Sequence, residues 1–407
     1  MDINSFDWIC CQIGAREHYA IPRVLHQSGR LKTLITDVWI DLYHPLNLLP
    51  ESYFSSLRTR YHHQLKTASV KSFTNSQIAW ELTQRFGKQE WELIIARNLW
   101  WQERVLKILE RKTENNLILF AYSYACLKLF KYAKYRGWKT ILGQIDPGII
   151  ESQSVAKIER KYPQLAVENV NPPDCYWSDW QQECSLADRI MVNSSWSVRA
   201  LQKAGINETK IVSVPLAYQK HSHSFVRTYP DRFTKQRPLK VLFLGQVIIR
   251  KGIAEILEAI ALLDKLAIEF WFVGQVKVTL PLSIINHPQI KWLGAVSRSQ
   301  TDRYYQQADV FLFPTHSDGF GLTQLEAQAW KLPIIASQFC GSVVKEQING
   351  LILPQITGKA IAHALIFCLN NPQVLSKFSH SSTHILSKFS LELLSQKITN
   401  IDINSNQ

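Results

Sequence analysis

The sequence predicts an α/β protein with two Rossmann-like, doubly wound domains that face each other across a cleft. Short apolar runs alternate with longer amphipathic stretches in both halves of the 407-residue chain. Each half also opens with a run typical of a buried strand, at residues 8–13 and again at residues 239–244. Between the halves, residues 219–238 are polar and lack apolar periodicity, which is typical of a linker.

In the first half, the strand at residues 8–13 leads through Gly14 into a helix. A later helix is expected at residues 196–204, where Asn193 or Ser194 would cap the first turn. Further short strands are predicted at residues 33–35, 93–95, 116–119, 139–142, 189–192 and 210–214.

In the second half, the strand at residues 239–244 is followed by a predicted helix at residues 251–264. The tail after residue 360 keeps helical apolar spacing, most clearly over residues 386–398. Additional short strands are predicted at residues 267–273, 291–293, 310–313 and 334–336.

Composition narrows the class of protein. A hydrophobic content of 46% with only 19% charged residues is typical of a folded globular chain and excludes a disordered one. The 46 basic and 33 acidic residues give a net charge of +13. This charge favours an anionic partner, which could be a nucleic acid, an acidic membrane surface or a phosphorylated substrate.

The cysteines and the apolar runs indicate the compartment. The seven cysteines are odd in number and contain no C-x-x-C pair, so a disulfide framework or a zinc site is not expected. The N-terminus lacks a basic-then-apolar pattern, and the longest apolar stretch, residues 117–127, is too short to cross a bilayer. We therefore expect a cytoplasmic protein, with peripheral contact to the membrane left open.

The most informative motif follows the apolar run at residues 309–314. A loop with Gly319 and Gly321 opens an alanine-rich helix, with Asp318 in the loop and Glu326 eight positions later. Loop amides and a helix N-terminus suit a phosphate, and the two carboxylates can accept hydrogen bonds from hydroxyl groups. This combination predicts a nucleotide-sugar site.

A second motif lies at residues 245–252, where a strand, a turn and a helix start bring Arg250 and Lys251 together. Two cations in such a turn can neutralise a diphosphate, and Lys251 is placed to reach across the cleft. A solvated pair of cations at a helix start is the alternative.

The spacing from Asp318 through Gly319, Phe320, Gly321 and Leu322 to Glu326 resembles the motif of the retaining glycosyltransferases of family four. These are glycosyl transferases of group 1, with the fold called GT-B. Family members usually have Glu in place of Asp318, and Arg in place of Gln246 in the cationic turn. The shorter Asp318 suggests that a different sugar fits the site. Gln246 lacks the positive charge of the usual Arg, so one phosphate contact is in doubt, and Arg250 could compensate for it.

The resemblance implies a role for each site residue. Glu326 would hold the ribose hydroxyls, Asp318 the hydroxyls of the transferred sugar, and Lys251 and Arg250 the diphosphate. The implied catalytic residues are Asp318, Lys251 and Asp146, and the implied donor-binding residues are Glu326, Gly319, Phe320, Gly321, Leu322, Thr323, Arg250, Gln246, Gly245, Val296 and Gly14. The chain has no Asp-x-Asp motif, so no metal site is expected.

The resemblance also divides the chain into functional segments. An N-terminal Rossmann-like acceptor domain would occupy residues 1–218, a linker residues 219–238, and a C-terminal donor domain residues 239–380. Residues 381–407 would form a C-terminal helix, which crosses back to the first domain in related enzymes.

The implied activity is transfer of a hexose from a UDP- or GDP-hexose to a saccharide or lipid-linked acceptor, in polysaccharide or glycolipid biosynthesis. Configuration would be retained, with neither a metal nor a cofactor. A nucleotide-sugar epimerase of the same fold and a non-catalytic nucleotide-sugar-binding or scaffold protein are the alternatives.

The acceptor site is less defined by the sequence. Asp146 follows a predicted strand at the edge of the cleft and could contact the acceptor or the donor sugar; an ordinary Asp-Pro turn is equally consistent. Basic and aromatic residues alternate in the segment 128–139, and a second basic stretch runs from Arg58 to Lys71. Either stretch could face an anionic membrane, although a solvated helix face is the simpler interpretation. No nucleic-acid motif accompanies these residues, so nucleic acid is not an expected partner.

Overall fold

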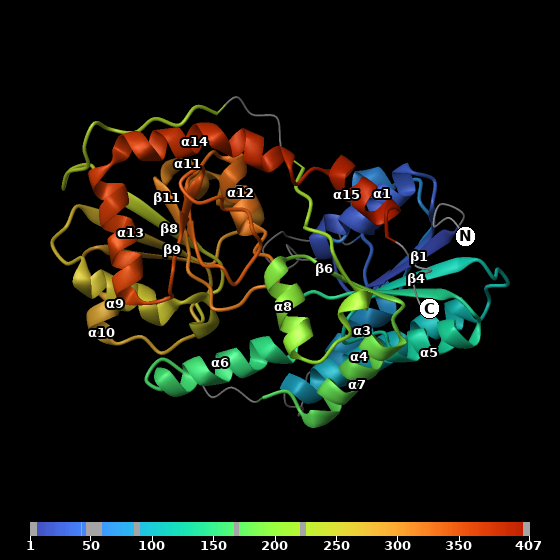
Figure 1. Ribbon diagram of the computed structural model, residues 1–407. Coiled ribbons are helices and arrows are strands. Elements are labelled where there is room, and N and C mark those ends of the chain that lie inside the picture. The colour runs from blue at the N-terminus through green and yellow to red at the C-terminus, as the bar shows by residue number, and fades with distance from the viewer. Residues whose placement is uncertain are drawn as a thin grey trace.

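The computed structural model describes residues 6–41, 43–45, 59–84, 90–166, 171–219 and 225–401. It contains a seven-stranded and a six-stranded sheet, each with parallel strand pairs and flanking helices. Figure 1 shows the two sheets in two lobes that lie side by side. The predicted α/β fold with two Rossmann-like, doubly wound halves is therefore confirmed.

The first sheet has the strand order β3-β2-β1-β4-β5-β6-β7. Its central strands are buried on both faces, as helices covering a parallel sheet require. The strands are β1 (Asp7–Gln12), β2 (Leu31–Thr36), β3 (Val70–Ser72), β4 (Leu117–Tyr122), β5 (Lys139–Gly143), β6 (Arg189–Val192) and β7 (Ile211–Ser213).

The helices of the first half include one that the sequence did not predict. The strand expected at residues 93–95 is wrong, because these residues lie inside the 20-residue helix α4. A short apolar run is ambiguous between strand and helix, and here the helix continues through Trp100 and Trp101, which pack against Phe73. The helices are η2 (Arg16–Tyr19), α1 (Ala20–Gln27), η4 (His63–Leu65), α3 (Thr74–Gln84), α4 (Glu90–Leu109), α5 (Leu127–Tyr135), α6 (Ile149–Lys161), α7 (Asp174–Leu186), α8 (Ser195–Lys203) and η5 (Glu208–Lys210).

The second sheet has the order β10-β9-β8-β11-β12-β13. Its strands are β8 (Leu239–Leu244), β9 (Ile268–Val273), β10 (Ile290–Gly294), β11 (Val310–Phe313), β12 (Ile334–Ala336) and β13 (Gly350–Ile352). Its helices are η6 (Ile249–Lys251), α9 (Ile253–Leu262), α10 (Leu282–Ile285), α11 (Arg298–Gln307), α12 (Thr323–Ala329), α13 (Gly358–Asn370) and α14 (Pro372–Ser387), followed by α15 (Leu391–Thr399).

In both sheets the strand order reverses at the first strand of the half. β1 lies between β2 and β4, and β8 lies between β9 and β11. A crevice at the carboxyl ends of the strands is expected at such a reversal, because the connections on either side leave to opposite faces. The loops after β1, β4, β8 and β11 are therefore the ones that build the site.

The C-terminal segment returns to the first half. α14 ends at Ser387, and the chain turns at residues 388–390 before α15 begins, so residues 381–401 form two helices rather than one. Leu394 and Ile398 of α15 join the core around β1, and Figure 1 shows α15 beside α1. Residues 402–407 lie outside the described residues.

A second element links the two halves. α6 begins beside the first sheet, but Ile158 and Tyr162 near its end join the core of the second sheet. The Tyr162 hydroxyl donates to Glu258 of α9 at 2.9 Å. The cleft is therefore bounded by helices that are anchored in both halves.

The basic and aromatic segment 128–139 is mostly committed to packing. Phe130 and Trp138 are buried in the first half, and Lys134 pairs with Asp188 at 2.6 Å. Among the described residues, no helix is long and apolar enough to cross a membrane. Arg58 of the other basic stretch lies outside the described residues.

Candidate functional site

The loop between β11 and α12 brings Asp318 against the cationic turn of η6. Lys251 Nζ contacts Asp318 Oδ2, and Arg250 Nη1 lies 3.7 Å from the same oxygen. Burial by itself would raise the pKa of Asp318, but Lys251 and Arg250 outweigh it and hold that pKa below its usual value. The turn and the loop that the sequence predicted therefore meet as one charged cluster.

Gly319 and Gly321 allow the loop to approach neighbouring atoms that a Cβ would clash with. A Cβ at Gly319 would lie 2.2 Å from the carbonyl oxygen of Ile145 in the first half. A Cβ at Gly321, where φ is +81°, would lie 2.5 Å from the Phe313 ring. Only glycine tolerates both positions, and Gly319 thus lets the two halves close on each other.

The start of α12 has unused backbone donors. Within the described residues, no acceptor is found for the N–H groups of Gly321, Leu322 and Thr323. Phe320 points away from this face and is buried against Phe389, at 5.8 Å between ring centroids. The loop therefore presents amides on one side and fills the core on the other.

Glu326 is held from two sides. The Tyr305 hydroxyl donates to Glu326 Oε2 at 2.8 Å, and Arg298 Nη2 lies 3.5 Å from Oε1. Arg298 also donates to His18 Nδ1 of the first half at 2.9 Å. Burial, with Arg298 and Arg23 close by, lowers the pKa of His18 to about 4, so that its ring is neutral at pH 7 and accepts this bond.

The remaining predicted donor-binding residues lie around this cluster. Gly245 directly follows β8, and its carbonyl oxygen lies so close to Gly274 that a Cβ added to Gly274 would be 1.9 Å away. Gln246 is exposed beside it, and Val296 is partly buried in the loop before α11.

The backbone of Gly14 is packed within the first half of the molecule. Its N–H donates to Asp37 Oδ1 at 2.8 Å, and a Cβ added to it would meet Arg60 Nη1 at 2.7 Å. The Gly14 amide is therefore already engaged, and its expected role toward the donor stays a prediction.

Sequence reasoning missed the residues that close the cleft around the cluster. Ser317 Oγ donates to Glu151 Oε2 of α6 at 2.7 Å and accepts from Trp196 Nε1 of α8 at 3.0 Å. Glu151 Oε2 also lies 3.5 Å from Arg250 Nη1. Burial raises the pKa of Glu151 to about 7, although Arg250 acts in the opposite direction. Nothing in the local sequence of α6 identifies Glu151, since only the docking of the halves gives it partners.

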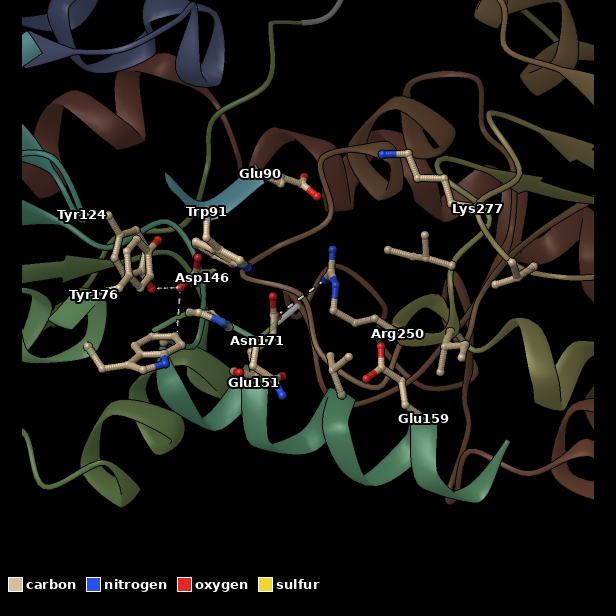
Figure 2. A pocket seen from close by; sticks show the side chains of 18 residues that line it. Glu90, Trp91, Tyr124, Asp146, Glu151, Glu159, Asn171, Tyr176, Arg250 and Lys277 are labelled. Atoms are coloured by element: carbon tan, nitrogen blue, oxygen red, sulfur yellow. Dashed lines mark hydrogen bonds and ion pairs between the residues drawn. The ribbon is translucent and has the colours of Figure 1, made fainter. Parts of the chain in front are cut away.

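A cavity of about 570 Å³ adjoins Arg250 and opens between the halves. Figure 2 shows Tyr124, Tyr176, Trp91 and Asp146 on one side of this cavity, with Arg250 and Lys277 on the other. The Tyr124 and Tyr176 rings are stacked, with centroids 4.8 Å apart. Of the predicted site residues, Asp146 and Arg250 line this cavity, whereas Asp318, Lys251 and Glu326 do not.

Asp146 is fixed in place at the wall of this cavity. Its Oδ1 accepts from the Tyr124 hydroxyl at 2.5 Å and from the Gly148 amide at 2.9 Å. The Gln144 side chain donates to the same oxygen at 3.1 Å and in turn accepts from buried Trp180. Asp146 therefore both caps the turn before α6 and faces the cavity. No group of three or more metal-ligating side chains occurs in the described part of the chain.

Comparison with known proteins gives the class of this domain. Residues 228–384 match the family model for glycosyl transferases group 1. The chain thus carries a glycosyl transferases group 1 domain within a GT-B fold.

Several relatives of this chain are named as glycosyltransferases. The chain is 24% identical over 294 residues to the uncharacterized glycosyltransferase MJ1178 of Methanocaldococcus jannaschii, covering 64% of this chain and 79% of that protein. It is 23% identical over 167 residues to the capsular polysaccharide biosynthesis glycosyltransferase CapM of Staphylococcus aureus, covering 38% and 43%. An uncharacterized 41.2 kDa protein of the Klebsiella pneumoniae cps region is 25% identical over 172 residues, covering 41% of this chain and 48% of that protein. The last two matches thus span less than half of each relative.

Solved structures share the fold over the whole chain. HepE of Anabaena in complex with UDP and glucose has a TM-score of 0.60 at 13% identity, covering 97% of this chain and 98% of that one. Sucrose-phosphate synthase of Thermosynechococcus elongatus has a TM-score of 0.65 at 15% identity, covering 97% of each chain.

Proposed function

We propose that the protein is a glycosyltransferase that moves a hexose from a nucleotide sugar to a saccharide or lipid-linked acceptor. The observation that carries this proposal is the convergence of Lys251 and Arg250 on Asp318 beside the unused amides of the α12 loop. Two cations and a set of backbone donors suit a diphosphate, and the neighbouring carboxylates suit sugar hydroxyls.

The donor would bind mainly to residues 239–380. Lys251 would leave Asp318, and Arg250 would leave Glu151, to bind the diphosphate. Glu326, which Tyr305 already orients, would accept hydrogen bonds from the ribose hydroxyls. Asp318 would then be free to accept from the transferred hexose. HepE, which shares the fold, has been solved with UDP-glucose, and this supports a UDP-hexose, with a GDP-hexose as the alternative donor.

We further propose that the reaction retains configuration and needs no metal. The bond between the anomeric carbon and the diphosphate oxygen breaks, and the acceptor oxygen bonds to that carbon from the same face of the sugar. The proton of the acceptor hydroxyl passes to the departing diphosphate. Lys251, Arg250 and the loop amides stabilise the charge that develops there, which is the principal catalytic effect expected of such a site.

The acceptor would enter the cavity between the halves, with Asp146 at its wall. CapM is named for capsular polysaccharide biosynthesis, and another relative, from Campylobacter jejuni, is named for transfer to a diphospho-undecaprenol-linked sugar. These names support a saccharide or lipid-linked acceptor.

The test is calorimetry with UDP- and GDP-hexoses, with and without EDTA, followed by NMR analysis of the anomeric configuration of the product. We expect one nucleotide sugar to bind and react equally well in EDTA, and Glu326→Ala to abolish slow release of its sugar. Failure of every nucleotide sugar to bind would overturn the proposal. Conversion of the donor into an isomer without an acceptor would identify an epimerase instead, and binding without any turnover a scaffold protein.

A further inference from the structure

We propose that the acceptor carries a phosphate group, and that this phosphate binds between Arg16 and Arg97 in the first half of the molecule. The inference rests on the proposed function, because it concerns the acceptor of that reaction. It is carried by a second cavity, of about 130 Å³, that both arginines line. This cavity shares Tyr124, Asp146 and Tyr176 with the larger one, so the two adjoin.

Both arginines are partly buried where they line this cavity. Arg97 lies on α4, and its Nε is buried without a hydrogen-bond partner. Arg16 lies on η2, with its guanidinium carbon 5.5 Å from the centroid of the Tyr122 ring. Over the described ranges, neither has a carboxylate within 4.0 Å. A guanidinium that is partly withdrawn from water is stabilised by a paired anion, so the cavity is suited to an anion supplied from outside.

The nearby carboxylates do not fill this role. Asp37 pairs with Arg60 at 3.2 Å and accepts the Gly14 amide at 2.8 Å. Asp146 already accepts three hydrogen bonds. Glu81 lies at an exposed position of α3 and accepts from Gln77. Burial raises the pKa of Glu17 to about 7, so that its carboxyl is only partly ionised at neutral pH. Among the residues that the structure describes, the cations around this cavity therefore exceed the carboxylates left to pair with them.

Other unused polar atoms line the same cavity. Ser123 Oγ and Gln12 Oε1 are buried and have no hydrogen-bond partner within the described residues. Buried polar atoms are rarely left unsatisfied, and a phosphate could accept from Ser123 and both arginines while a hydroxyl of the ligand donates to Gln12. A guanidinium binds a phosphate through two parallel hydrogen bonds, which favours phosphate over a simple halide.

The position of the cavity connects the phosphate to the acceptor sugar. The larger cavity is lined by the aromatic rings of Tyr124 and Tyr176, which suit the apolar face of a sugar ring, on the side opposite Arg250 (Figure 2). The 130 Å³ cavity also adjoins a third cavity, of about 190 Å³, because Arg97 and Ile94 line both. Trp80 and Leu93 line this third cavity as well. A phosphate at Arg97 could thus belong to a soluble sugar phosphate or to a sugar joined through phosphate to an apolar chain.

Binding to the full chain tests the inference. The protein is saturated with UDP to occupy the donor site and titrated with glucose 1-phosphate in one arm and decyl phosphate in the other, with calorimetry as the readout. We expect saturable binding of at least one probe. Arg97→Gln and Arg16→Gln should each weaken it about tenfold or more, as expected on losing a charge-assisted pair. The arm that binds tighter identifies the source of the phosphate.

The control is Arg104→Gln, which removes an arginine from the same helix, where it stacks over Trp100 at 5.1 Å. It should bind the probes as the wild type does. If Arg97→Gln unfolds, Arg97→Lys keeps the charge but loses the paired geometry and should still weaken binding.

Equal affinity in wild type, Arg16→Gln and Arg97→Gln would overturn the inference, as would no saturable binding by the wild type. Failure of UDP itself to bind would contradict the donor proposal alone, because the same titration without UDP still tests the dependence on Arg97.

Discussion

Arg250 Nη1 lies 3.5 Å from Glu151 Oε2, so that a side chain from each half of the molecule meets at the edge of the interdomain cavity (Figure 2). Ser317 reinforces this contact by donating to the same Glu151 oxygen. The cation proposed to bind the donor diphosphate is thus already occupied by a carboxylate. Donor binding and the contact between the halves must therefore compete for Arg250.

This competition predicts a pH-dependent donor affinity. Because the pKa of Glu151 is raised to about 7, its carboxylate competes fully for Arg250 above pH 7 and loses its charge below. We expect Glu151→Gln to bind UDP about 3- to 10-fold more tightly than wild type at pH 8, since a partly buried charge pair is worth about 1 kcal/mol. The difference should disappear near pH 6. Calorimetry at the two pH values measures it.

The raised pKa of Glu151 also makes the free energy of unfolding depend on pH. Between the ordinary carboxyl pKa of 4.5 and about 7, the folded state holds a proton that the unfolded chain has lost, so stability contributed by this group declines as pH rises. Glu103→Gln, which removes an exposed carboxylate paired with Lys128, is the control and should show neither effect. A constant ratio of wild-type to Glu151→Gln affinity from pH 6 to pH 8 would contradict the competition.

Lys251 is expected to matter most in the transition state. Lys251→Ala removes the cation closest to Asp318 and to the proposed leaving group. We expect kcat to fall about 10²–10³-fold, as when one donor to a developing negative charge is lost, with a smaller loss in UDP affinity. Steady-state kinetics measure this, and Lys359→Ala, at an exposed position of α13, is the matched control. A change confined to the KM for the donor would argue against a role in catalysis.

Tyr305 should position Glu326 rather than act directly. Tyr305→Phe removes the hydroxyl that donates to Glu326 Oε2 and keeps the ring in the core. We expect the KM for the donor to rise about 3- to 10-fold with kcat little changed, since one hydrogen bond to a charged group contributes about 1–2 kcal/mol. Tyr304→Phe on the same helix is the control, because the Tyr304 hydroxyl accepts from Arg303 instead. Equal KM values in the two variants would exclude the positioning role.

Gly319 should control the closure of the two halves. A Cβ in Gly319→Ala would lie 2.2 Å from the Ile145 carbonyl, so the halves must separate or the loop must shift. We expect activity to fall at least tenfold, a larger radius of gyration in solution scattering, and thermal unfolding close to that of wild type, because each core is intact. Ser342→Ala, which only removes atoms near Ser195 in the same interface, should leave both quantities unchanged. An unchanged radius of gyration together with full activity in Gly319→Ala would show that this close approach is not needed.

The predictable part of the fold was the part encoded locally. The strands at residues 310–313 and 334–336 coincide with β11 and β12, since apolar runs bounded by polar turns leave little ambiguity. The predicted cap of α8 is also confirmed, because Ser194 Oγ accepts from the Ser197 amide at 3.0 Å. The strand prediction at residues 93–95 was wrong because apolar residues in so short a run suit a strand or a helix equally well. Packing against the first sheet decides between the two.

The site residues also divide into those that the sequence identifies and those that only the structure identifies. The glycines around Phe320, the two carboxylates at Asp318 and Glu326, and the cations at Arg250 and Lys251 can be recognised from sequence because their spacing along the chain is itself the motif. Glu151 and Arg97 carry no such spacing. Each acquires its significance from side chains that are distant in sequence.

The sequence by itself thus determined two doubly wound halves and a loop, from Asp318 to Glu326, chemically suited to a nucleotide sugar. The spacing of apolar residues and the residues that form turns are local properties, so they can be recognised from the sequence alone. Only the tertiary structure decided that Lys251 and Arg250 meet Asp318, that Glu151 lies against Arg250, and that Arg16 and Arg97 line one cavity where no described carboxylate pairs with them. These relationships depend on distances of a few ångströms between residues far apart in the chain, and only the docking of the helices and sheets sets those distances.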